Sequence, residues 1–180
     1  KGTVAVSGAK NAVLPMMAAS LLTTEPVVLH NVPDLKDIET MMELLVKVGV
    51  SATREGSTVR LQVKDESLST APYELVSTMR ASFCLLGPLL AKRGRAEVSL
   101  PGGCVIGHRP VDLHIKGMRA LGASVAVSRG YVLAESRKLR GAPIDLGGAF
   151  GSTVTGTANI LMAAVLADGL TIVENAAQSN

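Results

Sequence analysis

The order of predicted elements recurs along this chain, and that repetition constrains its fold more than any other feature. In the first copy a strand-like segment (residues 3–7) precedes an apolar helical segment (12–22), a short strand (27–30), an amphipathic helix (38–48) and a hairpin (51–63). The helical segments place apolar residues at the 3.6-residue period, whereas the hairpin alternates around a glycine turn. One unit is therefore strand, helix, strand, helix and hairpin.

The same order returns 68 to 73 positions further on, and a third copy begins without being completed. The second copy comprises helix 79–91, strand 96–100, helix 111–121 and hairpin 124–134. The third comprises a strand from residue 143, helix 159–167 and strand 170–173. Repeats of this length indicate stacked, pseudo-symmetric α/β units. We therefore predict a single α/β domain over residues 1–180, with repeats at about 1–66, 67–136 and, in part, 137–180.

Composition excludes several classes of protein. Apolar residues make up 47% of the chain and charged residues 18%, which is not the balance of a disordered protein. Aromatic residues make up 2%, Trp is absent and the net charge is only +3, so a nucleic-acid partner is not expected. Segment 12–22 is shorter than the roughly 20 residues that cross a bilayer, so no membrane span is expected.

The two cysteines lie in contrasting segments. Together they do not make a disulfide framework in a chain of this length, so a reducing, cytoplasmic location is expected. Cys84 lies in the apolar run 83–86 and is expected to be an inert core thiol. Cys104 lies in a Gly- and Pro-rich loop, 101–112, that joins a strand to a helix. A loop that carries a thiol is typical of a functional site, although an ordinary Gly-Pro turn explains the local composition equally well.

Three turns occupy the same place in their repeats, each directly before the apolar helix: residues 7–11, 77–82 and 151–157. Pseudo-symmetry would bring three helix N-termini to one end of the domain, where main-chain amides and the helix dipole favour anions. Two of these turns also supply a cation, Lys10 and Arg80. Ordinary capping explains any one turn, but the coincidence of three predicts an anion site to which Lys10, Arg80 and Arg109 contribute.

Several motifs carry a resemblance to a known family. They are Ser-Gly-Ala-Lys-Asn at 7–11, Asn-Val-Pro at 31–33 with Asp37, Thr-Met-Arg-Ala-Ser at 78–82, Pro-Gly-Gly-Cys-x-Ile-Gly-x-Arg-Pro-Val-Asp-Leu-His at 101–114, and Gly-x-Thr-Ile-x-Glu-Asn-Ala-Ala at 169–177. The chain resembles, over essentially its whole length, the N-terminal part of the UDP-N-acetylglucosamine 1-carboxyvinyltransferases (UDP-GlcNAc enolpyruvyl transferases). The thiol motif is specific, because the sister 3-phosphoshikimate 1-carboxyvinyltransferases share the fold but not that thiol.

The resemblance implies a fold and a reaction. Members have two domains, each an inside-out α/β barrel of three repeated units with helices inside and sheets outside, so this chain would form half of the fold. They transfer enolpyruvyl from phosphoenolpyruvate to the 3-hydroxyl of UDP-GlcNAc and release phosphate, which is the first committed step of peptidoglycan synthesis. No cofactor and no metal are implied. The partners would be the two substrates and the second domain.

The resemblance also implies residue roles. Cys104 would donate a proton to the methylene of phosphoenolpyruvate, and it would be the thiol that fosfomycin alkylates. Lys10, Asn11 and Arg109 would bind phosphoenolpyruvate, mainly by electrostatic stabilisation. The residues implied for UDP-GlcNAc binding are Asn11, Arg80, Arg109, Pro110, Val111, Asp112, Leu113, Gly151, Ser152, Thr153 and Val154.

The chain departs from the family pattern in two ways. Residues 153–157 read Thr-Val-Thr-Gly-Thr where Ser-Val-Gly-Ala-Thr is commoner, and Gly151 stands where some members have a lysine. A main-chain contact to the diphosphate would survive this change, whereas a charged contact from position 151 would not. The aspartate that members use at the attacking hydroxyl, and a further phosphate-binding arginine, belong to the second domain. We therefore expect this chain alone to be inactive.

Other functions remain open. A non-catalytic module that binds a UDP-sugar or another anion would keep the same surface, but it would have no need for a thiol at position 104. The sister 3-phosphoshikimate activity is a second alternative. A metal site of Cys104, His108 and His114 is disfavoured, because their spacing matches no common zinc pattern and a fourth ligand is not evident. His30 is expected to be a partly exposed histidine at the end of a strand.

Overall fold

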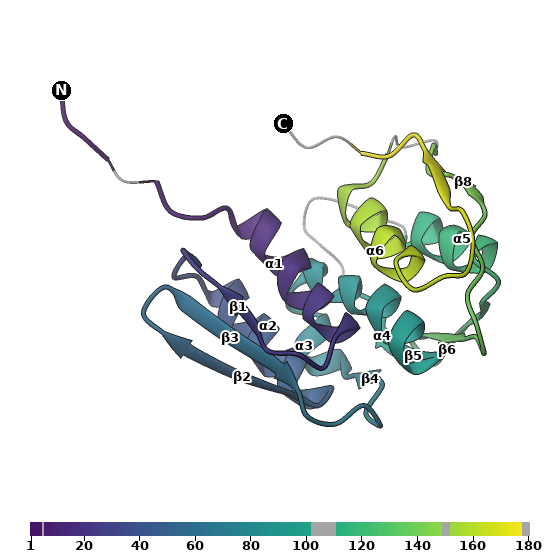
Figure 1. The fold of residues 1–180 in the computed structure, drawn as a ribbon, viewed down its shortest axis with the longest axis horizontal. Coiled ribbons are helices and arrows are strands. Elements are labelled where there is room, and N and C mark those ends of the chain that lie inside the picture. Colours follow the sequence, from purple (N-terminus) through teal and green to yellow (C-terminus); the bar gives the residue numbers. More distant parts are fainter. Residues whose placement is uncertain (5, 102–110, 149–151, 178–180) are drawn as a thin grey trace.

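Figure 1 shows the computed structural model of the chain, which describes residues 1–4, 6–101, 111–148 and 152–177. The elements of the first repeat are α1 (Lys10–Ala19), the 3-10 helix η1 (Ser20–Leu22), β1 (Val27–Leu29), α2 (Lys36–Lys47), β2 (Val50–Glu55) and β3 (Thr58–Val63). Those of the second are β4 (Thr70–Ala71), α3 (Tyr73–Val76), the 3-10 helix η2 (Arg80–Leu85), α4 (Leu86–Arg93), β5 (Arg95–Ser99), α5 (Asp112–Ala120), β6 (Ser124–Ser128) and β7 (Tyr131–Glu135). The third contributes β8 (Pro143–Asp145), α6 (Val154–Ala164) and β9 (Ile172–Glu174).

The strands form three separate sheets whose orders correspond. The first sheet has the antiparallel order β1-β3-β2, and the second has the order β4-β5-β7-β6. Strands β5, β7 and β6 repeat the arrangement of the first sheet, while β4 lies parallel beside β5. The third sheet contains β8 and β9, which pair in parallel as β4 and β5 do. The repeat boundaries given above remain a prediction, but these orders are what three related units would produce.

Helices of all three repeats meet at the centre of the molecule. Helix η2 contacts both α1 and α6, and α6 also contacts α4 and α5. In Figure 1 α1, α4 and α6 lie between the sheets, and their chains run in the same general direction. One buried apolar cluster joins them, with Met17, Leu21 and Phe83 among its largest members. The described residues form no closed barrel, and among them no helix is both long and apolar enough to cross a membrane.

The predicted strand at residues 3–7 is wrong for the residues that the structure describes. Lys1–Val4 and Val6–Ser7 carry no regular structure and point away from the body (Figure 1). Val4 and Val6 are 86% and 88% exposed, so neither is held by a partner strand. The segment nevertheless lies close to β1 where it approaches α1, because the Gly8 amide donates to the Asn31 carbonyl at 3.2 Å. Alternation in the sequence predicted a strand, but among the described residues no strand pairs with this segment.

The helix predicted at 79–91 is two helices. Its first part is the 3-10 helix η2, and α4 begins only at Leu86. Pro88 accounts for part of this break, because a proline ring clashes with the carbonyl four residues earlier and is tolerated in the first turn of an α-helix. The helix predicted at 159–167 begins earlier, at Val154, because the Thr153 hydroxyl accepts a hydrogen bond from the Gly156 amide at 3.2 Å and caps it.

Gly87 gives a test of how closely α4 and α6 pack. A Cβ at this position would collide with the main-chain carbonyl oxygen of Asn159. Alanine favours a helix by up to about 1 kcal/mol over glycine, but overpacking a core costs about 1–3 kcal/mol. We expect Gly87→Ala to lower the free energy of unfolding, measured by urea denaturation. Gly2→Ala is the matched control, because nothing lies within 4 Å of its Cβ position. An unchanged urea midpoint for Gly87→Ala would show that α4 and α6 can move apart to fit the added methyl group without loss of stability.

Candidate functional site

The predicted site residues stand at the starts of four helices that contact one another in pairs. Lys10 is the first residue of α1, Arg80 of η2, Asp112 of α5 and Val154 of α6. Helix η2 touches α1 and α6, and α6 touches α5, so residues far apart in the sequence are carried by neighbouring helices. In Figure 1 the N-terminal ends of α1, α4 and α6 all face the upper side of the molecule. Such an end favours anions through its amides and dipole.

Lys10 is held by an aspartate of the same repeat. Its Nζ donates to Oδ2 of Asp37, in the first turn of α2, at 2.8 Å. The two side chains are 43% and 36% exposed, and an exposed pair of this kind contributes about 0–1 kcal/mol. The pair therefore orients the ammonium group without making it inaccessible to an incoming anion. Asn11 follows on α1 and is exposed.

Arg80 is half-buried where η2 begins, after the extended backbone of Met79. The positive charge of Arg80 acts on the buried imidazole of His114 on α5. Burial is the main cause that lowers the pKa of His114 to about 4, and the positive charge of Arg80 lowers it further, while Asp112 opposes this. Arg80, at the start of η2, therefore acts electrostatically on a buried ring of α5.

The starts of α5 and α6 present mainly main-chain groups and small side chains. Asp112 is exposed, but Leu113 is only 9% exposed, so its main chain is the part that a ligand could contact. Ser152 is exposed, and the hydroxyl of Thr153 is occupied by its cap to the Gly156 amide. Val154 is 49% exposed. A ligand at the start of α6 would therefore meet amides rather than a charged side chain.

Some predicted site residues lie outside the described part of the chain, whereas Cys84 and His30, which were not predicted as site residues, lie within it. The predicted site residues that lie outside the described residues are Cys104, Arg109, Pro110 and Gly151. Cys84 is confirmed as a core thiol: it is fully buried, and burial raises the pKa of its thiol to about 12. His30 is exposed at the end of β1, with Nδ1 3.3 Å from the hydroxyl of Thr58.

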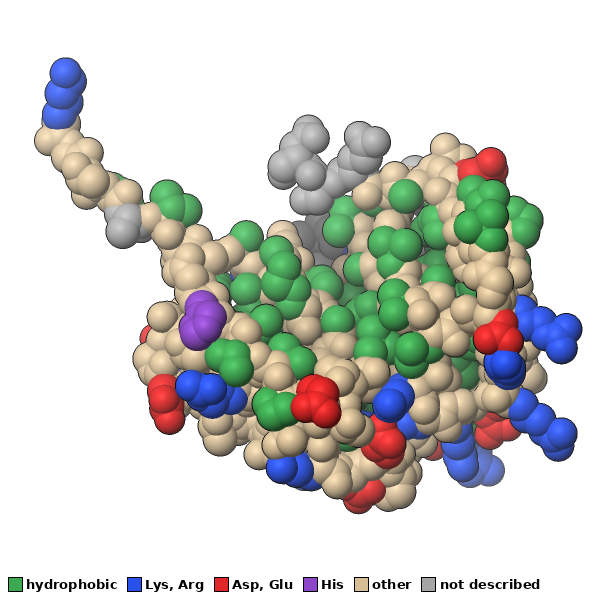
Figure 2. Space-filling view, in the orientation of Figure 1, with side chains coloured by type: hydrophobic (Ala, Val, Ile, Leu, Met, Phe, Trp, Pro, Cys, Tyr) green, Lys and Arg blue, Asp and Glu red, His purple; other side chains and the backbone are tan. Residues whose placement is uncertain are grey.

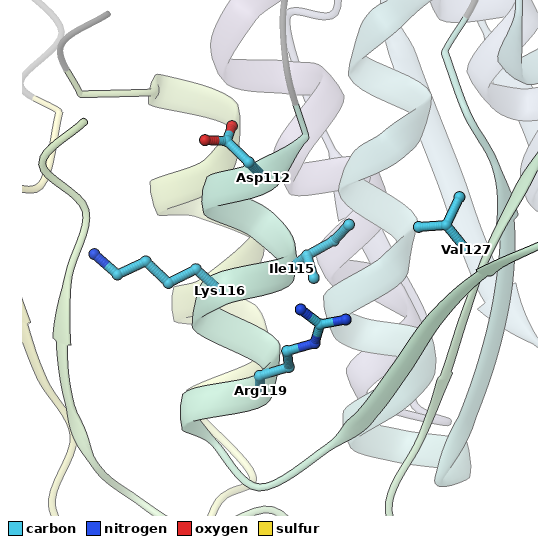
Figure 3. Close-up of a pocket in the computed structure, with 5 residues that line it drawn as sticks. All are labelled: Asp112, Ile115, Lys116, Arg119 and Val127. Atoms are coloured by element: carbon cyan, nitrogen blue, oxygen red, sulfur yellow. The ribbon is translucent and has the colours of Figure 1, made fainter. Parts of the chain in front are cut away.

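Two pockets among the described residues lie beside the helix starts rather than between them. One, of about 470 Å³, lies between α5 and β6 and is lined by Asp112, Ile115, Lys116, Arg119 and Val127 (Figure 3). Ile115 and Val127 face each other across it, whereas Lys116 points away and pairs with Asp145 at 3.6 Å. The other, of about 540 Å³, is lined by Ser7, by residues 31–34 and by Arg54, Gly56 and Ser57. In the part of the chain that the structure describes, no group of three or more His, Cys, Asp or Glu residues could hold a metal ion.

Sequence reasoning missed Asn159 beneath the helix starts, and it considered its neighbour His114 only as a motif residue and a disfavoured metal ligand. Both are buried, at 0% and 2% exposure, and they are hydrogen-bonded to each other. The signal for Asn159 was present in the sequence, because an amide among Ile160, Met162 and Ala163 on an apolar helix must find partners in the core. Nothing in the sequence identified those partners.

Comparisons with known proteins agree with this fold. The model of the EPSP synthase (3-phosphoshikimate 1-carboxyvinyltransferase) family matches residues 1–180. UDP-N-acetylglucosamine 1-carboxyvinyltransferase of Methylacidiphilum infernorum (isolate V4) is 53% identical over 177 residues, which cover 98% of this chain and 42% of that protein. The chain thus spans less than half the length of that relative.

Solved structures share the fold at low sequence identity. The enolpyruvyl transferase NikO from Streptomyces tendae superposes with a TM-score of 0.79 at 21% identity, over 96% of this chain and 40% of that one. EPSP synthase from Acinetobacter baumannii gives 0.76 at 17% identity, over 99% of this chain and 41% of that one. These likenesses show the fold alone. Together with the family match over the whole chain, they lead to one conclusion: the chain belongs to the EPSP synthase family of enolpyruvyl (carboxyvinyl) transferases.

Proposed function

We propose that this chain is the N-terminal part of a UDP-GlcNAc enolpyruvyl transferase. The longer enzyme would transfer enolpyruvyl from phosphoenolpyruvate to the 3-hydroxyl of UDP-GlcNAc, release phosphate, and so begin peptidoglycan synthesis in the cytoplasm. The observation that carries the proposal is the 53% identity, over 98% of this chain, to a protein named for that activity. Identity to an EPSP synthase of the same fold is only 17%.

The proposed chemistry assigns a bond change to each group. The thiol of Cys104 gives its proton to the methylene carbon of phosphoenolpyruvate, and the adjacent carbon becomes oxocarbenium-like. The sugar 3-hydroxyl attacks that carbon and loses its proton to a base in the second domain. The bond from that carbon to the phosphate oxygen then breaks while the methyl group returns a proton to the Cys104 thiolate, which restores the double bond and the thiol. The departing phosphate takes up the proton that the base received from the sugar hydroxyl. Lys10 and Arg109 stabilise the phosphate and carboxylate charges throughout.

The helix starts that the structure describes would each bind a different part of the two substrates. Lys10, oriented by Asp37 at 2.8 Å, would exchange that partner for the anion of phosphoenolpyruvate. Arg80 and Asp112, which both act on His114, would bind UDP-GlcNAc with Asn11. The start of α6 would hold the diphosphate through main-chain amides, because Thr153 is engaged in its cap. No cofactor, metal or nucleic acid enters this proposal.

An exposed apolar surface supports the proposal that these residues are part of a larger protein. Apolar side chains gather over α1, α6 and β9 (Figure 2). The exposed members of this surface include Met16, Leu161, Val165, Leu170 and Ile172, each at least 50% exposed. Among the described strands β9 pairs only with β8, whereas β1 and β5 each pair with a hairpin strand. We infer that a further helix and hairpin complete the third repeat here, and that a second domain closes over the helix starts.

The identity of the acceptor substrate distinguishes the proposed function from the sister activity. With the longer protein and phosphoenolpyruvate, we expect phosphate release to depend on UDP-GlcNAc and not on 3-phosphoshikimate. Because Cys104 would be the proton donor, Cys104→Ser should lower kcat by roughly 10²–10⁴, whereas Cys84→Ser would show whether a buried thiol matters to turnover. Release with 3-phosphoshikimate alone would establish the sister activity. Binding of UDP-GlcNAc without any phosphate release would establish a binding module.

A further inference from the structure

One buried side chain joins the helices that carry the predicted UDP-GlcNAc residues. The amide of Asn159, on α6, makes three hydrogen bonds in the core. Its Oδ1 accepts from the Gly87 amide at 2.6 Å, and its Nδ2 donates to the Phe83 carbonyl at 3.0 Å and lies 2.9 Å from Nδ1 of His114 on α5. Asn159 therefore connects α6 with η2, α4 and α5 at a single point.

The two main-chain partners of Asn159 identify its role in the second repeat. In a continuous α-helix the Gly87 amide would donate to the carbonyl four residues earlier, which is that of Phe83. Here the side-chain amide stands between these two groups and satisfies both. A side chain inserted into the helical ladder is a recognised cause of a kink. Asn159 thus stabilises the break at which η2 ends and α4 begins, and so sets the direction of the turn that starts at Arg80.

The main-chain partners also fix the orientation of the amide and the state of His114. The Gly87 amide can only donate and the Phe83 carbonyl can only accept, so the Asn159 oxygen and nitrogen cannot be exchanged. Nδ2 then has its second hydrogen directed at Nδ1 of His114, which must accept it. His114 is accordingly neutral and protonated on Nε2. Its ring also meets that of Phe83 edge to face, with centroids 5.0 Å apart.

The helices approach one another closely at this contact. A Cβ at Gly87 would collide with Asn159, and a Cβ at Gly117 on α5 would collide with the Ile160 side chain of α6. The two glycines let α4 and α5 approach α6 closely, and the polar bonds then define how the helices are set along one another. Apolar packing alone would give stability with less definite register.

We propose that Asn159 and His114 are positioning residues, which hold the starts of η2 and α5 in register so that Arg80 and Asp112 can bind the same UDP-sugar. This rests on the proposed function for the identity of the ligand. Neither residue contacts substrate in the proposal. Both act through the helices that they join.

Two variants of His114 separate the hydrogen bond from packing, and the longer two-domain enzyme is the protein to test. His114→Phe keeps a ring against Phe83 but removes the acceptor and leaves an Asn159 N–H unsatisfied in the core. His114→Asn gives up ring volume but offers an oxygen close to where Nδ1 stood. Ile160→Val is the matched control, because it thins the packing of the same helix against Gly117 without touching the bonds.

We expect His114→Phe to raise the KM for UDP-GlcNAc about tenfold, with a smaller change in kcat, since a buried unsatisfied donor distorts the binding geometry. His114→Asn should restore the KM to within about threefold of wild type, a partial rescue through the retained acceptor. Ile160→Val should lower the melting temperature and leave the KM unchanged. Equal KM values for His114→Phe and Ile160→Val would reduce the network to ordinary core packing and overturn the proposal.

Hydrogen exchange keeps the two proposals distinguishable. A wild-type enzyme that releases no phosphate with UDP-GlcNAc would end the proposed function, and amide exchange would still decide the positioning role. His114→Phe should accelerate exchange in residues 80–87 and 112–117, and leave the β2–β3 hairpin as in wild type. A uniform acceleration across the chain would mean that His114 supports global stability alone, and the positioning role would then be wrong.

Discussion

In the folded protein, an epoxide phosphonate or a maleimide is expected to label Cys104 at least 10³-fold faster than Cys84. The reactive species is the thiolate, and burial raises the pKa of the Cys84 thiol to about 12. At pH 7.5 a thiol with that pKa holds roughly 10³-fold less thiolate than one with the ordinary value of about 8.5. Cys84 is also fully buried, and its Sγ lies 3.7 Å from the Thr155 carbonyl, so the reagent must wait for local opening.

Peptide mapping after short labelling times would measure the two rates. In denaturant both thiols should react at similar rates, because the burial that protects Cys84 is then lost. Raising the pH of the folded protein should speed the labelling of Cys84. Below the pKa of this thiol, each added pH unit raises its thiolate fraction tenfold. Labelling of Cys84 ahead of Cys104 in folded protein would contradict the assignment of Cys104 as the reactive thiol.

Local patterns predicted the later part of the second repeat closely. The hairpin expected at 124–134 is formed by β6 and β7, and its turn lies at Arg129 and Gly130. Both residues have positive φ, 50° and 79°, which is the geometry of the tight turns that join two antiparallel strands. The helix expected at 111–121 is α5, and it contains His114 as predicted. In these cases the determining interactions are local, so a single sequence contains them.

The errors arose where distant parts of the chain decide the outcome. Residues 3–7 alternate like a strand, but whether they pair depends on a partner strand elsewhere in the chain, which the alternation does not identify. The break inside the helix expected at 79–91 depends on Pro88, which is visible in the sequence, and on Asn159, which is 72 positions from Gly87. Periodicity carries no information about such a partner.

In the candidate site, too, local features were predictable and contacts between distant residues were not. Lys10 and Arg80 were expected at helix starts, and the structure places both there. The aspartate that orients Lys10 lies 27 positions away, and the amide that bridges to His114 lies 45 positions from it. Helix starts follow from local turn chemistry, whereas the contacts that orient their side chains depend on how the repeats are packed.

Residues 1–180 alone are expected to release phosphate from phosphoenolpyruvate and UDP-GlcNAc at least 10²-fold more slowly than the longer enzyme. The chain spans 42% of the length of the relative that it matches. The proposed reaction needs a proton donor, a site for phosphoenolpyruvate, and a base at the sugar hydroxyl. Loss of one positioned acid or base commonly lowers the rate by roughly 10²–10⁴.

The two carboxylates near the helix starts have other roles in the proposal. Asp37 is bound to Lys10 at 2.8 Å, and Asp112 stands at the start of α5 where the proposal places the UDP-sugar. Asn11, Asp112 and Ser152 are all exposed, so the helix starts form an open surface. Water weakens electrostatic stabilisation at such a surface, and closure by a second domain would exclude it.

Phosphate release should therefore be measured for residues 1–180, for the longer enzyme, and for residues 1–180 mixed with a separately produced remainder. We expect release by residues 1–180 to be slower by at least the factor given above. Activity should recover in part in the mixture, because the apolar surface over α6 and β9 would bind the remainder. Weak UDP-GlcNAc binding by residues 1–180 should persist through Arg80 and Asp112, since these groups do not depend on the base. Turnover by residues 1–180 at the rate of the longer enzyme would show that the base and the closed site are both within this part of the chain, and the two-domain division of the chemistry would be wrong.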